Sequence, residues 1–164
     1  MELINGEFVY MAKPTREHKV FELHIGMALE QFILSKNGLC HTFIERAVIP
    51  NPVDKKTELV PDISVLCDDS KEQGYHILGC PDLVIEILSP STRHRDLGIK
   101  KKKYQDGGVR EYWTVDLEKE CVLVNDFEKR DQVRWYSFND KVPVGIFDHQ
   151  CLVDFDFIKK RCEM

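Results

Sequence analysis

The stretch that most constrains the fold of this chain is the apolar run Leu83–Leu88, which only Glu86 interrupts. The turn-forming residues Ser89–Ser91 follow the run directly. A short apolar run that ends at turn signals is typical of a strand buried on both faces, near the middle of a sheet. A glutamate is almost never fully buried alone, because an unpaired buried carboxylate loses its hydration. The sequence therefore predicts a cation beside Glu86, either a metal ion or the side chain of a lysine or arginine.

The composition is that of an ordinary globular protein. Of the 164 residues, 43% are hydrophobic and 31% are charged. This length predicts a single domain, 1–164, with a substantial core. No apolar run approaches the roughly 18 residues of a membrane span, and residues 1–7 lack the features of a signal peptide. We therefore expect a cytoplasmic protein.

Net charge and cysteine spacing argue against two classes of protein, general nucleic-acid coats and zinc proteins with the usual ligand spacing. The net charge is −5, so the chain is not a general nucleic-acid coat, because non-specific DNA affinity depends on distributed basic residues. A polyanion would have to bind a local patch, and the stretch 93–103 provides one. There is no C-x-x-C pair, so a zinc site of the usual spacing is not expected. In a reducing cytosol the six cysteines are expected to act as small hydrophobic residues: Cys40, Cys67, Cys80, Cys121, Cys151 and Cys162.

The order of sequence patterns predicts an α/β fold with a mixed sheet. Asn5-Gly6 indicates a hairpin turn, and Thr15 is a candidate N-cap for a helix that runs to about Ser35. The apolar face of this helix is expected to hold Val20, Leu23, Met27 and Leu34. Later patterns predict strands at 41–49, 59–67 and 83–88, a helix from 95 or 96 to 105, a strand at 109–115, and a hairpin of 121–124 with 133–138. The core order is therefore helix, three strands, helix, strand.

Asp62 and Asp82 are the acidic residues considered as partners of Glu86 in a metal site. Asp82 lies on the same strand as Glu86 and about 13 Å away, too far to share one ion. Asp62 lies on a different predicted strand, and neighbouring strands are only about 4.8 Å apart. Two carboxylates with a backbone carbonyl and water form an oxygen site that suits Mg²⁺ or Mn²⁺. The alternative is that Glu86 pairs with a lysine and Asp62 caps a strand end.

The helix predicted after this strand supplies lysines. At 100° per residue, Leu97 and Tyr104 lie within about 20° of each other and define the inner stripe. Lys100 and Lys101 flank this stripe on opposite sides, so helical phase alone does not choose between them. An ammonium group beside metal-bound carboxylates can orient water or stabilise a developing oxyanion.

Several motifs occur in order along the chain: Asn5-Gly6-Glu7, Val60-Pro61-Asp62, the run from Pro81 to Thr92, Arg95-Asp96, Lys100 with Tyr104, and the run from Gly108 to Trp113. Together they resemble the Uma-type family of putative restriction endonucleases, a branch of the PD-(D/E)xK nucleases. The resemblance covers almost the whole chain, and the run from Pro81 to Thr92 is specific to the family. It implies a restriction-endonuclease-like α-β-β-β-α-β core with extra N- and C-terminal hairpins, which agrees with the order predicted from the patterns.

The resemblance also implies a set of site residues: the metal ligands Asp62, Glu86 and the Ile87 carbonyl, and the catalytic Lys100. Leu88 occupies the position of the lysine in the superfamily's E-x-K motif. The lysine is thus displaced onto the following helix, where Lys100 matches. His18 falls where such sequences often carry a histidine, although a histidine on a helix face is more often structural.

These residues predict a Mg²⁺- or Mn²⁺-dependent endonuclease that hydrolyses DNA and contacts it through Arg93, Arg95, Lys102 and Lys103. The alternative is a non-catalytic binding or assembly module with the nuclease fold, which the net acidity and the missing E-x-K lysine favour. A two-carboxylate sugar hydrolase is not favoured, because no aromatic platform is expected near Glu86. A homodimer is also predicted, because a strand buries only alternate members of the aromatic stretch Trp135–Phe138 on one face. The other interpretation is that the protein's own second sheet face covers these residues.

Overall fold

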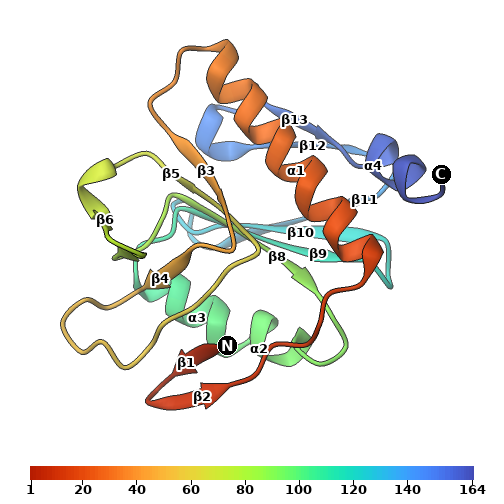
Figure 1. Ribbon diagram of the computed structural model, residues 1–164. Helices are drawn as coiled ribbons and strands as arrows, with labels where there is room; N and C mark the ends of the chain where they lie inside the picture. Colours follow the sequence, from red (N-terminus) through yellow and green to blue (C-terminus); the bar gives the residue numbers. More distant parts are fainter.

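The structure is a computed structural model that describes residues 1–164, and a six-stranded mixed sheet forms its centre (Figure 1). The strand order is β11-β10-β9-β8-β5-β3, in which β8 and β9 are parallel and all other neighbours are antiparallel. The strands are β3 (His41–Ile44), β5 (Ile63–Leu66), β8 (Leu83–Leu88), β9 (Glu111–Asp116), β10 (Cys121–Asp126) and β11 (Gln132–Ser137). The predicted central position of β8 is therefore confirmed, and so is the predicted order of core elements.

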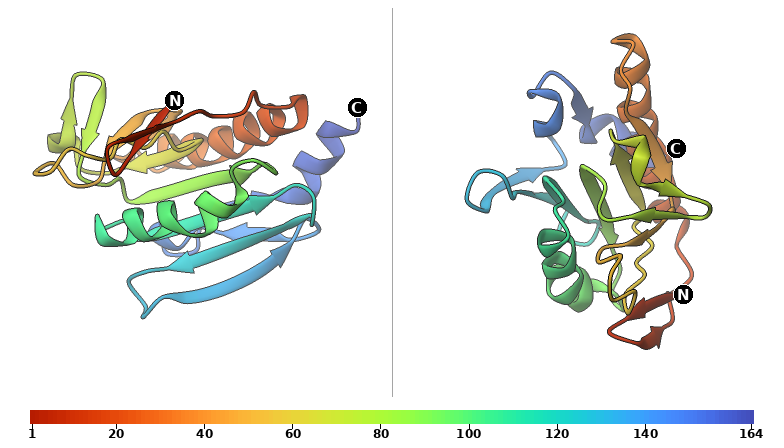
Figure 2. Two further views of the ribbon diagram at one scale, coloured as in Figure 1. Left: turned by 90° about the horizontal axis from the view of Figure 1, so that it is seen from below. Right: turned by 90° about the vertical axis from the view of Figure 1, so that its left-hand side faces the viewer.

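Helices cover both faces of this sheet. On one face α1 (Arg16–Ser35) and α4 (Phe155–Cys162) join a core that includes Ile85 of β8. On the other face the pair α2 (Arg93–Leu97) and α3 (Ile99–Asp106) follows β8, and Tyr104 of α3 belongs to a second core with Val84. In the right-hand view of Figure 2, the orange α1 and the green α2–α3 pair lie on opposite sides of the sheet.

Side-chain alternation along β8 decides where Glu86 points. Leu83, Ile85 and Ile87 belong to the core beneath α1, whereas Val84 belongs to the core beneath α3. Successive side chains of a strand point to opposite faces, so Glu86 points toward α3 together with Val84. All residues of β8 are buried, and Glu86 itself is only 3% exposed. Glu86 is therefore a buried carboxylate on the α3 side of the sheet.

The first helix begins as predicted but buries a different face. The Thr15 side chain accepts a hydrogen bond from the His18 amide at 3.1 Å, which confirms the N-cap. The predicted apolar face is wrong, because Leu23 is 56% exposed and Met27 and Leu34 are exposed as well. The buried residues are instead Phe21, Glu22, Ile25, Gly26, Leu29 and Ile33. This helix carries apolar residues on two stripes, and only packing against the sheet selects one of them.

Chain bends make three predicted boundaries wrong. The predicted strand 41–49 is divided at Glu45, which has a φ of 51°, and β4 (Ala47–Ile49) joins a separate small sheet with β6 (Glu72–Gln73) and β7 (His76–Leu78). The predicted strand 59–67 is regular only over β5, at 63–66. The predicted helix to 105 is divided at Gly98 into α2 and α3, so Leu97 is 39% exposed and does not belong to the inner stripe.

Further elements lie at the two ends of the chain. β1 (Glu2–Ile4) and β2 (Glu7–Val9) form the predicted hairpin around Asn5-Gly6, and β10 with β11 forms the predicted later hairpin. A strand pair of β12 (Lys141–Pro143) and β13 (Leu152–Asp154) then leads into α4, which has no counterpart among the predicted elements. Two short 3₁₀ helices complete the chain, η1 (Asp69–Lys71) and η2 (Gly145–Phe147). None of the helices combines the length and apolar character that a membrane crossing requires.

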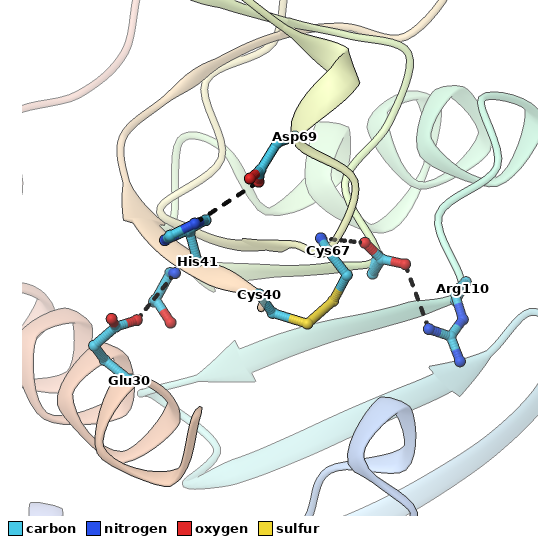
Figure 3. Close-up of a disulfide and its surroundings, with 8 residues drawn as sticks. Glu30, Cys40, His41, Cys67, Asp69 and Arg110 are labelled. Carbon is cyan, nitrogen blue, oxygen red and sulfur yellow. Dashed lines mark hydrogen bonds and ion pairs between the residues drawn. A yellow bond between two sulfur atoms is a disulfide. The ribbon is translucent and has the colours of Figure 1, made fainter. Parts of the chain in front are cut away.

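Two of the six cysteines form a disulfide, so the expectation that all six act as small hydrophobic residues is wrong for this pair. Cys40, which precedes β3, and Cys67, which follows β5, form a disulfide (Figure 3). In the β3–β5 register His41 pairs with Leu66, so the two cysteines are the next cross-strand pair. The other four cysteines are free, and Cys80, Cys121 and Cys151 among them are buried. The sequence expectation is therefore wrong for one pair, because only strand pairing brings these two residues together.

Candidate functional site

Asp62 stands directly before β5 and connects that strand to two other elements. Its Oδ2 accepts a hydrogen bond from the Ile87 amide of β8 at 2.6 Å, and its Oδ1 lies 3.1 Å from His18 Nε2 on α1. In an extended strand the N–H and C=O of one residue point to the same side. The Ile87 carbonyl therefore lies on the side of β8 that Asp62 occupies. Asp62 thus lies beside Ile87 of the central strand, and the roles of both as metal ligands stay a prediction.

Glu86 has a cationic partner, and that partner is Lys100. Lys100 Nζ lies 2.6 Å from Glu86 Oε1, and the Tyr104 hydroxyl donates a hydrogen bond to the same oxygen at 3.0 Å. Lys100 is 3% exposed, whereas Lys101 is only half-buried. The cation expected beside Glu86 is therefore the lysine Lys100, and the catalytic role of Lys100 stays a prediction.

Burial and charge act together on this pair. Burial raises the pKa of Glu86 well above its ordinary value, the Lys100 ammonium opposes this shift, and the charges of Asp96, Asp62 and Glu2 add to it. Burial lowers the pKa of Lys100, but the surrounding carboxylates outweigh burial and raise it. Lys100 therefore remains an ammonium, and the carboxylates around it are in excess.

Two members of this group were not predicted from the sequence. Lys100 Nζ lies 3.0 Å from Glu2 Oε1 and 3.1 Å from Asp96 Oδ1, and both carboxylates are buried. Asp96 precedes Lys100 by four residues, and that spacing is a signal that could have indicated the pair. No local pattern relates Glu2 to Lys100, because Glu2 reaches the site through the folding of the N-terminal hairpin.

A second group of potential ligands surrounds Asp62. One donor atom each from His18, Glu22 and Asp62 lies within 4.8 Å of the others. Burial lowers the pKa of His18, but its hydrogen bond to Asp62 and the Asp62 charge outweigh burial, so the pKa is raised. Glu22 was not predicted, although its position four residues after His18 places both on one helix face. Glu22 is buried, and its Oε1 has no hydrogen-bond partner.

Both groups open into one acidic pocket of about 320 Å³. His18, Asp62, Glu86, Ile87 and Lys100 all line it. Eight of the lining residues are acidic, whereas the lysine and arginine residues in the lining are Lys13, Arg93 and Lys100. A phosphodiester anion is repelled by such a surface unless added positive charge offsets the carboxylates.

The predicted DNA contacts are distributed unevenly around this pocket. Arg93 lines it and forms an ion pair with Asp116. The pocket lining does not include Arg95, Lys102 or Lys103. Lys102 is exposed and pairs with Asp106, and Lys103 donates a hydrogen bond to Asn5. Contacts between these four residues and DNA stay a prediction.

Asp82 lies outside the pocket lining and has a structural role. Its Oδ2 accepts a hydrogen bond from the Cys67 amide at 2.8 Å, and its Oδ1 lies 3.4 Å from Arg110 Nη1. These contacts tie the start of β8 to the end of β5. Asp62, rather than Asp82, is therefore the aspartate beside Ile87 of the central strand.

The donor atoms around Asp62 fit a hard divalent cation such as Mg²⁺ or Mn²⁺. Carboxylate and carbonyl oxygens dominate, and His18 adds a nitrogen that Mn²⁺ accepts. The unpartnered Glu22 Oε1 and the excess of carboxylates are two features that a bound cation would satisfy. His18, Glu22 and Asp62 form one donor set. The sequence predicts a second set, with Asp62, Glu86 and the Ile87 carbonyl. The Glu86 carboxylate is held by Lys100 and Tyr104 and does not belong to the first set.

Comparison with known proteins agrees with this fold. Over part of its length the chain is similar to an uncharacterized protein (slr1290) of Synechocystis sp., with 29% identity over 87 residues. The match covers 53% of this chain and 45% of that relative, so it spans less than half of the relative's length. The structure resembles the crystal structure of a putative nuclease from Anabaena variabilis, with a TM-score of 0.80 at 19% identity, covering 97% of this chain and 89% of the other.

The structural likeness, at this level of identity, establishes the nuclease-like fold. The family is shown by the sequence itself. Residues 1–145 match the Uma2 family, which is described as a putative restriction endonuclease family. The matched part contains β8, α2, α3 and every member of the two groups around Asp62 and Lys100. The chain therefore belongs to the Uma2 family of putative restriction endonucleases.

Proposed function

We propose that this chain is a metal-dependent endonuclease that hydrolyses phosphodiester bonds of DNA. The observation that carries the proposal is the buried Lys100–Glu86 ion pair, 2.6 Å long, beside Asp62 in an acidic pocket. A carboxylate and an ammonium buried together at the C-terminal end of a central strand cost desolvation energy, so stability alone does not favour them. Perturbed titratable groups that converge on a pocket are instead typical of a catalytic site.

The proposed metal ligands are Asp62, Glu86 and the Ile87 carbonyl, with His18 and Glu22 as further donors. When bound, Mg²⁺ or Mn²⁺ supplies a Lewis acid for the phosphoryl oxygen and a lowered pKa for an attacking water. The protein's own contribution is positional. His18 and the Ile87 amide hold the two oxygens of Asp62 in place. The Lys100 ammonium stabilises negative charge that develops on the phosphoryl oxygens.

The predicted DNA contacts and the predicted dimer belong to the same proposal. Arg93 at the pocket and Lys102 on the exposed side of α3 are proposed to contact phosphates, and Arg95 and Lys103 flank them in the sequence. The dimer is proposed to form through Trp135, which is 62% exposed on the edge strand β11. Phe138 is buried in the chain's own core, so it does not contribute to such an interface.

Metal binding and plasmid cleavage test the proposal together. We expect wild type to cleave plasmid DNA with Mg²⁺ or Mn²⁺, and Glu86→Ala and Lys100→Ala to lose about 100-fold or more of that rate. Glu86→Ala leaves Lys100 between Glu2 and Asp96, so the variant is expected to fold. Lys101→Ala is the matched control, because Lys101 neighbours Lys100 on α3 but does not line the pocket, and this variant should retain the rate.

Calorimetric titration with Mn²⁺ separates the possible outcomes. Asp62→Asn should abolish binding, and comparison of Glu86→Gln with Glu22→Gln shows which donor set contributes more. Binding of Mn²⁺ at Asp62 without cleavage would reject the nuclease and favour a non-catalytic module. Cleavage that persists in Glu86→Ala would show that the activity comes from a contaminant or from another site.

A further inference from the structure

Three carboxylates from three separate elements surround the Lys100 ammonium. They are Glu86 of β8 at 2.6 Å, Glu2 of β1 at 3.0 Å and Asp96 of α2 at 3.1 Å. All four side chains are at most 4% exposed. Each of these contacts is an ion pair with the same ammonium. Lys100 is therefore held electrostatically by carboxylates from three separate elements.

The position of Lys100 on a helix explains why so many partners are needed. A lysine on β8 itself would be placed by the strand backbone, but that position is occupied by Leu88. Lys100 must instead reach Glu86 from α3 with a flexible four-carbon stem, whose ordering costs side-chain entropy. Glu86 Oε1 is also shared with Tyr104, so Glu86 alone does not hold the ammonium.

Glu2 joins this ammonium to the segment that carries Asp62. The same Glu2 Oε1 that contacts Lys100 accepts a hydrogen bond from the Val60 amide at 2.9 Å. Leu3, the next residue, exchanges two backbone hydrogen bonds with Glu58, at 2.9 and 2.7 Å. The N-terminal strand β1 is thereby bound to residues 58–60, which precede Asp62 in the chain. The Glu2 carboxylate extends from this strand to Lys100.

Asp96 contacts the ammonium from α2. The helix is interrupted at Gly98, between α2 and α3. Asp96 and Lys100 nevertheless form an i,i+4 ion pair across this interruption. The Tyr112 hydroxyl of β9 donates a hydrogen bond to the Asp96 carbonyl at 2.7 Å, which ties this point of α2 to the sheet. Asp96 is thus anchored independently of Glu86.

We propose that Glu2 and Asp96 are positioning residues that hold the Lys100 ammonium at the reaction site, so that full activity requires the N-terminal strand β1. This inference rests on the proposed nuclease function. Glu2 and Asp96 keep Lys100 in place when the Glu86 carboxylate is engaged as a metal ligand. Neither residue touches the reacting atoms, and both act through Lys100.

The test is a double-mutant cycle that combines Glu2→Gln with Lys100→Ala. A second cycle combines Asp96→Asn with Lys100→Ala. Glu2→Gln keeps an oxygen for the Val60 amide and removes only the charge, so the variant should fold. We expect kcat to fall about tenfold and KM to change much less, because Glu2 acts on the reaction through the position of Lys100. In the Lys100→Ala background, Glu2→Gln should cause no further loss. Glu58→Gln is the matched control, because its carboxylate faces His76 and not Lys100.

The same variants are compared in urea unfolding, which does not depend on catalysis. The loss of stability in the double variant should be smaller than the sum of the single losses, because both remove one ion pair. Additive losses in unfolding, or a Glu2→Gln effect on kcat that is as large in Lys100→Ala as in wild type, would overturn the proposal. If wild type cleaves no DNA, the nuclease function fails, and the unfolding cycle still decides whether Glu2 and Lys100 are coupled.

Discussion

The Cys40–Cys67 disulfide should contribute strongly to stability, because it closes a long loop. The two cysteines are 27 residues apart, and restricting a loop of that size in the denatured chain is worth about 3.5 kcal/mol. Both side chains are only half-buried, so loss of packing adds little. Replacing both with alanine should therefore lower the free energy of unfolding by about 3.5 kcal/mol, or the Tm by about 10 °C for a chain of this length.

Thiol titration and urea unfolding measure this contribution. In denaturant without reductant, four of the six cysteines should react, and all six should react after reduction. Reductant should lower the unfolding midpoint of wild type and leave that of the double alanine variant unchanged. Cys162→Ala is the matched control, because Cys162 is a half-buried free thiol, and this variant should respond to reductant as wild type does.

Two results would refute this reasoning. One is the reaction of all six thiols before reduction, and the other is an unfolding midpoint of wild type that reductant does not change. The candidate site should survive reduction, because Asp62 precedes β5 whereas Cys67 follows it. DNA cleavage by the reduced, folded protein is therefore expected to persist.

The remaining predictions concern His18, DNA and the dimer. An NMR titration of His18 should give a pKa above 6.5, and Asp62→Asn should lower that pKa, because the Asp62 charge that opposes the effect of burial is removed; an unchanged titration would contradict the contact. Because the folded pKa is raised, the contribution of His18 to stability is complete below pH 6.5 and is lost as the pH rises through the folded pKa. Arg93→Ala and Lys102→Ala should each reduce the salt dependence of DNA binding by about one unit of slope, and a wild-type slope would argue against a phosphate contact. Light scattering at micromolar concentration should give a dimer mass for wild type and a monomer mass for Trp135→Glu, and a monomeric wild type would reject the interface.

Particular elements show why some sequence predictions are correct and others wrong. β8 was predicted well because an apolar run that ends at a turn requires burial on both faces, whatever surrounds it. The face of α1 was predicted wrongly, because Leu23 and Phe21 are both apolar and periodicity ranks neither first. The helix after β8 was predicted as one element, since a single Gly98 within a helical pattern does not reveal a break. Predictions of this kind fail wherever two local solutions have similar energies and packing decides.

The site divides in the same way. From the apolar run alone, Glu86 was expected to be buried beside a cation, because an ionised carboxylate inside an apolar strand needs a compensating charge. Residue pattern and family resemblance together indicated Asp62 and Lys100. Three further contacts were visible only in the folded chain: Glu2 and Asp96 share the same ammonium, Glu22 joins His18 at Asp62, and Cys40 pairs with Cys67. These contacts join residues far apart in the chain or on opposite sides of a helix break, and their partners are set by strand register and helix packing, which no local pattern records.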